Sequence, residues 1–178
     1  MRRTASLIWL AACCGMLLTT SGCMTAAKTA LHELRGAHAE LLLVSTPLRQ
    51  QVAACNRLDF TPATTTLGAK LCPPKVLRAF DRNTRDLRKN EKIAAAFSGG
   101  EPTLRVDSEI YYYQEKGLLG GAQLLVHVKM HGGDQLLVDA LVVAESKAFR
   151  EGGSSALSEA GVKAIGKFLR KQKNPDCD

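Results

Sequence analysis

The chain has 178 residues, of which 46% are hydrophobic and 23% are charged, as in an ordinary globular protein. This length suits one domain plus a targeting segment and excludes two domains of typical size. The formal net charge of +7 is not arranged as a basic stripe with aromatic residues among it, so the composition does not favour nucleic-acid binding.

Residues 1–22 have the three parts of a secretory signal peptide. Arg2 and Arg3 supply positive charge, and an uncharged apolar run over 7–18 follows them. About 12 apolar residues are fewer than the roughly 20 that a helix needs to span a bilayer. We therefore expect export by a cleaved leader rather than a permanent transmembrane helix.

The apolar run is followed by Thr20-Ser21-Gly22-Cys23, which resembles the end of a bacterial lipoprotein signal peptide. Ser21 and Gly22 match the two small residues of that family, whereas Thr20 stands where Leu or Val is usual. The resemblance implies a thioether-linked diacylglycerol on Cys23, cleavage after Gly22 and acylation of the new amino group. Several acyl chains on one cysteine hold a protein firmly on a membrane.

A second match, Leu10-Ala11-Ala12-Cys13, fits the four-residue pattern better. It leaves only about eight apolar residues before the cysteine, at the short end of the usual range, so we favour Cys23 and keep Cys13 as the alternative. Met24 follows Cys23, whereas an Asp there favours retention at the inner membrane in enterobacterial lipoproteins. By that analogy we expect the chain on the outer membrane, facing the periplasm.

We interpret residues 23–48 as the lipidated cysteine and a tether. The helical spacing of Leu31, Leu34, His38 and Leu41 favours a helix there. Pro47 should end this helix. Alternating apolar residues predict a first strand over 50–62, and Pro62 and Gly68 mark the loop that follows.

A first amphipathic helix is predicted to start at Pro73-Pro74, because proline suits the first helical turn. Asn90 should end it. Its apolar face is formed by Val76, Leu77, Phe80, Thr84 and Leu87. The short apolar segment 93–97 is predicted to be a strand.

Strands are predicted over 104–113, 124–131 and 135–149 from their alternation of apolar and polar residues. Gly132-Gly133 predicts a two-residue hairpin turn between the last two, since both residues tolerate positive φ. In the first of these strands Tyr112 shares the parity of the core residues, so Tyr111 and Tyr113 should lie exposed. Tyrosine is enriched at interfaces, and we predict a partner-binding patch at Tyr111 and Tyr113.

A last amphipathic helix is predicted after Gly152-Gly153, with Ser154 or Ser155 as its cap. The densest basic run of the chain lies at its end: Lys163, Lys167, Arg170, Lys171 and Lys173. We interpret these residues as solvated charges that complement the helix dipole. Weak attraction to anionic lipid is the alternative.

These elements predict an α+β domain over 49–172 and a disordered tail over 173–178. The expected order is β-α-β-β-β-β-α, with two helices on one face of a mostly antiparallel sheet of four to five strands. Over 50–170 this order resembles the uncharacterised lipoprotein domains related to the TolB amino-terminal domain and to curli-secretion-type lipoproteins. The resemblance implies a non-catalytic partner in envelope assembly.

Cys55 and Cys72 are the candidates for a disulfide, because export allows disulfides to form. Closing this loop of about 17 residues would contribute about 3 kcal/mol in the chain-entropy model. Two buried thiols, or pairing of either residue with Cys177, remain alternatives.

No phosphate loop, nucleophile elbow or metal-binding spacing occurs in the sequence, so we expect no cofactor, no metal and no catalytic residues. We predict a lipid-anchored, non-catalytic protein that binds envelope proteins and no nucleic acid. One alternative is an enzyme whose pocket gathers His127, Asp107 or Glu109. Another is a subunit of an oligomeric secretion complex.

Overall fold

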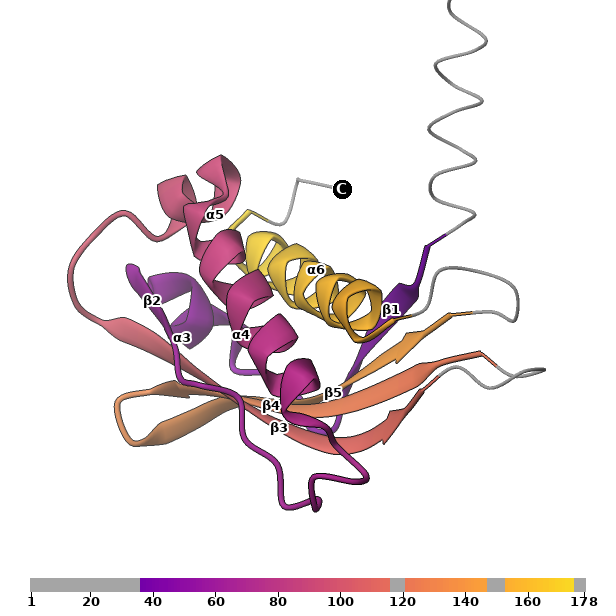
Figure 1. Cartoon of the computed structure of the whole chain (residues 1–178). Helices are drawn as coiled ribbons and strands as arrows, with labels where there is room; N and C mark the ends of the chain where they lie inside the picture. Colours follow the sequence, from indigo (N-terminus) through magenta and orange to yellow (C-terminus); the bar gives the residue numbers. More distant parts are fainter. Residues whose placement is uncertain (1–35, 116–120, 147–152, 175–178) are drawn as a thin grey trace, which may run out of the picture. The chain divides into compact units, whose positions relative to one another are not determined.

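In the part of the chain that the structure describes, five strands form one mixed sheet in the order β1-β5-β4-β3-β2 (Figure 1). The computed structural model describes residues 36–115, 121–146 and 153–174. Cys13, Cys23 and Cys177 lie outside these residues, as does the predicted extension of the last strand to 149. The strands are β1 His38–Leu43, β2 Arg57–Phe60, β3 Thr103–Gln114, β4 Gln123–Gly132 and β5 Gln135–Glu145.

The helices that the structure describes all lie on one side of the sheet (Figure 1). They are α3 Arg49–Ala54, α4 Pro74–Lys89, α5 Glu91–Ala96 and α6 Ser154–Lys173. The predicted α+β class is therefore confirmed, with α4, α6 and the central strands β3, β4 and β5 where the patterns place them. β1, β5, β4 and β3 pair antiparallel, but β2 pairs parallel to β3 and makes the sheet mixed.

The predicted tether contains an edge strand instead of a helix. β1 pairs antiparallel with β5, and Leu41 lies opposite Val142. Ala39 and Leu41 pack against the core, whereas Leu42 is exposed. Because β1 belongs to the sheet, the domain begins at Ala37 rather than at residue 49.

Two segments that were predicted as strands are helical in part. Residues 50–62 divide into α3 and β2, and 93–97 belong to α5 and its end. The Asn90 side chain accepts a hydrogen bond from the Lys92 N–H at 3.2 Å, so this residue ends α4 and also caps α5. Segments of about five residues are too short for periodicity to separate a helix from a strand.

A register shift between Ile110 and Tyr112 reverses the predicted facing of Tyr112 and Tyr113. Tyr113 is buried at 8% exposure, whereas Tyr111 and Tyr112 are 42% and 46% exposed. One extra residue in a strand changes which side the following side chains face. The prediction that Tyr112 packs in the core and Tyr113 lies on the surface is therefore wrong.

The hairpin between β4 and β5 forms one residue later than predicted. Its two-residue turn is Gly133-Asp134, and Gly133 has φ of 60°, a conformation that glycine adopts at little cost. Gly132 is the last residue of β4, where a Cβ would come within 2.9 Å of the Leu137 Cδ1.

Both ends of α6 differ from prediction. Gly153 precedes the helix with no side-chain cap, because Ser154 and Ser155 already belong to the first turn. At the other end Lys173, predicted as the start of a disordered tail, is helical. Its Nζ donates to the Ala53 carbonyl at 2.8 Å and lies 4.9 Å from the Phe97 ring centre.

The core lies between the sheet and α6, which packs against β5, β1 and α4. Its largest buried side chains include Phe80, Leu104, Ile110, Leu124, Met130, Leu157, Ile165 and Leu169. Three elements meet at Gly161 of α6, where a Cβ would lie 3.4 Å from the Val142 Cγ1 of β5 and 3.8 Å from the Phe80 Cε2 of α4. Within the described ranges, no helix has the length and apolar character that crossing a bilayer requires.

The close approach at Gly161 predicts opposite effects for two substitutions. Gly161→Ala fits the space and should stabilise the domain by up to about 1 kcal/mol, because alanine favours the helix. Gly161→Leu should lower the free energy of unfolding by about 1–3 kcal/mol through overpacking. Urea unfolding followed by circular dichroism measures both. Glu159→Leu on the exposed side of α6 serves as the control. Equal changes in the free energy of unfolding for the two Gly161 variants would contradict the close packing at this position.

Candidate functional site

The sheet face opposite the helices is left uncovered by the described elements (Figure 1). The strand register identifies the side chains that share it. Leu42 of β1 lies opposite Leu141 of β5, and Leu125 of β4 lies opposite both Val143 of β5 and Tyr112 of β3. Because side chains alternate along a strand, these residues all point away from the helices.

We call this group, together with Tyr111, the apolar strip. It crosses four strands, and its members differ in exposure. Leu42, Tyr111 and Tyr112 are each more than 40% exposed, whereas Leu125, Leu141 and Val143 are partly buried by their neighbours. The exposed members lie on β1 and β3, and apolar side chains gathered on one face are typical of interaction sites.

A hydrogen-bonded chain adjoins the apolar strip and connects three strands. The His127 Nε2 lies 2.6 Å from the Asp139 Oδ1, and the His127 Nδ1 lies 2.8 Å from the Tyr111 hydroxyl. An ionised carboxylate can only accept, so Nε2 donates to Asp139. The Tyr111 and His127 rings are also in contact, with centres 5.1 Å apart. This chain holds Tyr111 in place on the surface.

A second polar group surrounds Asp107 on the same face. Its carboxylate accepts from the Thr61 hydroxyl at 2.9 Å and pairs with Arg105 at 3.3 Å. The His131 Nε2 lies 3.5 Å from the same carboxylate. These contacts connect the segment after β2 to β3 and β4, and they engage both Asp107 oxygens.

The structure brings His127, Asp107 and Glu109 together, as the enzyme alternative requires. With Lys129 they line a depression of about 250 Å³. This volume is below the roughly 300–1,000 Å³ of small-molecule sites. Both ring nitrogens of His127 are hydrogen-bonded, one to the Asp139 carboxylate and the other to the Tyr111 hydroxyl. Among the described residues, no group of three or more His, Cys, Asp or Glu side chains could hold a metal ion.

Cys55 and Cys72 are both buried free thiols, so the predicted disulfide is wrong for this structure. A Cβ at Gly132, which lies opposite Leu104, would be 3.8 Å from the Cys55 sulfur. Cys72 contacts Thr65, whose hydroxyl donates to the Ile110 carbonyl at 2.8 Å.

The two thiols therefore lie beside different parts of β3. Leu104 and Ile110 are six residues apart, which corresponds to about 20 Å along a strand. A disulfide requires Cα atoms within about 7 Å of each other. Burial raises the pKa of both the Cys55 and the Cys72 thiol, which makes each less reactive.

The sequence predicted Tyr111 as an exposed residue of this face. It did not predict the exposure of Tyr112 or the pairing of His127 with Asp139. Tyr112 was missed because a bulge inside a run of three tyrosines leaves no pattern in the sequence. The partnership of His127 with Asp139 depends on the register of β4 and β5. A second register shift lies between Met130 and His131. Because of this shift, the position of the turn does not by itself determine which residues of β4 and β5 lie opposite each other.

No protein-family model matches the chain, and no curated protein sequence matches it either. Solved structures with distant similarity include the PelC dodecamer from Paraburkholderia phytofirmans, at 10% identity and a TM-score of 0.45. That match covers 77% of this chain and 97% of the PelC chain, as does a match to a single-residue variant, at 8% identity and a TM-score of 0.41.

The hypothetical protein CT253 from Chlamydia trachomatis is 10% identical with a TM-score of 0.43. The match covers 69% of this chain and all of CT253. At these identities and TM-scores, none of the similarities assigns an activity or a partner to the chain.

The placement of the cysteines predicts their reactivity. Iodoacetamide should leave Cys55 and Cys72 unmodified in the native protein and alkylate both in denaturant without reductant, because both are buried thiols. Peptide mass spectrometry measures the modification, and an exposed Ser98→Cys thiol serves as the native-state control. A Cys55–Cys72 linked peptide in the non-reduced digest would contradict the structure.

Proposed function

We propose that this protein is a lipid-anchored, non-catalytic envelope protein that binds another envelope protein through the uncovered face of its sheet. The observation that supports the binding role most directly is the apolar strip. Leu42, Tyr111 and Tyr112 expose apolar surface on a face that the described helices do not cover.

The polar groups of this face also suit a binding surface. Its polar side chains hydrogen-bond one another, as in the chain of Tyr111, His127 and Asp139. An aromatic side chain held by such bonds loses little further conformational freedom when a partner covers it. Tyrosine also contributes much of the binding energy at protein interfaces, since it combines a large apolar area with a polar group.

The proposed anchor rests on the sequence alone. Ser21-Gly22-Cys23 follows a positively charged and then apolar leader, the arrangement of a lipoprotein signal peptide. A lipid on Cys23 would hold the domain at a membrane surface, and we propose the periplasmic side of the outer membrane. Anchoring of this kind raises the local concentration of a domain near membrane partners.

The anchor predicts how substitutions at two cysteines change fractionation. Cys23→Ser should move the protein from the membrane to the soluble envelope fraction, because the acyl chains are lost. Cys13→Ser is the matched control and should leave the protein on the membrane. Immunoblots of separated fractions, with and without globomycin, measure the effect. Membrane retention of Cys23→Ser, with loss of Cys13→Ser, would assign the anchor to Cys13 instead.

The binding face predicts where a partner can be crosslinked in cells. A photo-reactive phenylalanine at position 112 should capture a discrete envelope protein, and a second probe at position 111 should capture the same one. The same probe in place of Lys89 on α4, behind the sheet, is the control and should capture none. Leu42→Ser should reduce the yield, because it removes apolar contact area.

Equal capture from positions 112 and 89, or none from position 112, would contradict a binding role for this face. Mass spectrometry of the crosslinked band identifies the partner. Crosslinking in the Cys23→Ser background separates the two parts of the proposal, because binding through the sheet face does not itself require the lipid.

A further inference from the structure

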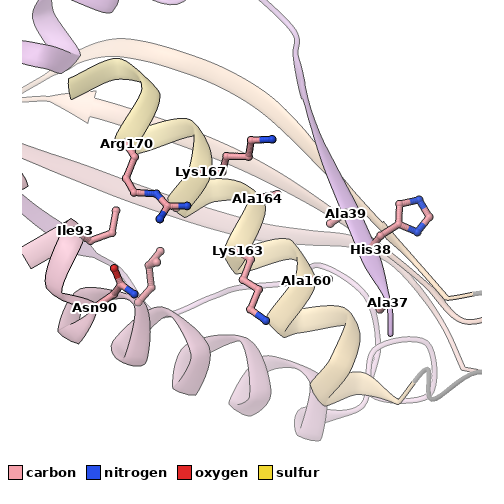
Figure 2. Close-up of a pocket in the computed structure, with 12 residues that line it drawn as sticks. Ala37, His38, Ala39, Asn90, Ile93, Ala160, Lys163, Ala164, Lys167 and Arg170 are labelled. Atoms are coloured by element: carbon pink, nitrogen blue, oxygen red, sulfur yellow. The ribbon is translucent and has the colours of Figure 1, made fainter. Parts of the chain in front are cut away.

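A separate groove of about 470 Å³ lies on the helical side of the domain (Figure 2). It runs over α6 between the corner of α4 and α5 and the beginning of β1. Its apolar part is formed by Leu87, Ile93, Ala160 and Ala164. Small residues from α6 and β1 keep this part open, and none of its lining belongs to the apolar strip on the other face of the sheet.

The groove carries positive charge that the residues described by the structure neutralise only in part. Lys163, Lys167 and Arg170 project from α6 at its lining (Figure 2), whereas none of the described residues that line it is acidic. Lys163 pairs with Glu159 at 2.6 Å. Lys167 and Arg170 have no ion pair or side-chain hydrogen bond within the described part of the chain.

The combination of an apolar cleft with cations at its edge selects a class of ligand. An anion alone would leave the apolar part unoccupied, and a neutral apolar ligand would not use Lys167 and Arg170. Nucleic acid is disfavoured because the described residues of the lining include no Phe, Tyr or Trp on which bases could stack. An anionic amphiphile fits both parts, with its charged group at the cations and its hydrocarbon in the cleft.

We propose that this groove binds an anionic phospholipid of the membrane to which the chain is anchored. The choice of a membrane lipid rests on the proposed anchor. Ala37 lines the groove, and Cys23 precedes it by 14 residues, a length of chain that reaches at most about 50 Å. A lipid on Cys23 would therefore keep the groove close to a bilayer, and guanidinium and ammonium groups are the usual protein partners of phosphate.

The test uses short-chain lipids that stay monomeric in solution, so it does not depend on whether Cys23 is lipidated. The full chain is titrated calorimetrically with dihexanoyl phosphatidylglycerol, dihexanoyl phosphatidylcholine and inorganic phosphate. The phosphatidylglycerol should bind at least about tenfold more tightly than either of the others, because only it can use both the cations and the apolar cleft.

Two variants assign the binding to the groove. Lys167→Gln with Arg170→Gln should weaken phosphatidylglycerol binding at least about tenfold. Arg57→Gln with Lys70→Gln removes the same charge from exposed sites elsewhere and should leave binding unchanged. Ala164→Leu fills the cleft and should abolish the advantage of the lipid over phosphate. Thermal unfolding confirms that each variant is folded.

Several results would overturn the proposal. Phosphate that binds as tightly as the phosphatidylglycerol would show an anion site only, and equal binding of phosphatidylcholine would show that the cations contribute nothing. If both charge-changing pairs reduce binding equally, the effect is a general one of net charge. If no variant changes binding, the lipid binds outside the groove. Absence of binding would also overturn it, whereas the anchor and the sheet-face partner would be unaffected.

Discussion

The packing of α6 onto one face of the sheet is the contact on which the rest of this structure depends. The helix closes the core at the C-terminal end of the chain and reaches back to α4, β1 and α3. Gly161 brings its backbone near Val142 and Phe80, and Lys173 connects its last turn to Ala53 and Phe97. Removal of apolar surface from water at these contacts is the main force that orders the layers.

Because the helices cover only one side of the sheet, its two faces differ chemically. The inner face is apolar, and the outer face mixes the apolar strip with the networks around His127 and Asp107. The hydrogen bonds from Tyr111 through His127 to Asp139 connect β3, β4 and β5 on this face. The outer face is thus organised before any partner arrives, which lowers the conformational cost of binding to it.

The two proposed binding surfaces lie in different layers and have different chemistry. The sheet face offers tyrosine and leucine beside neutral or paired polar groups, which suits a folded protein partner. The groove offers Lys167 and Arg170 beside a narrow apolar cleft, which suits an anionic lipid. Because these surfaces share no residues, a lipid and a protein partner could occupy the domain together.

The sequence by itself determined the elements that are long and regular: α4, α6, and the antiparallel strands β3, β4 and β5 with their glycine hairpin. Their hydrophobic periodicity persists over enough residues to be unambiguous. It also supplied Tyr111 as a surface residue and the argument for an anchor at Cys23. Only the tertiary structure decided the short elements α3, β2, α5 and β1. In six residues or fewer, the spacing of apolar residues is compatible with both a helix and a strand. It likewise decided which tyrosines face outward and how far apart Cys55 and Cys72 lie. Both depend on long-range packing, because neither a register shift nor the separation of two distant segments follows from a local sequence pattern.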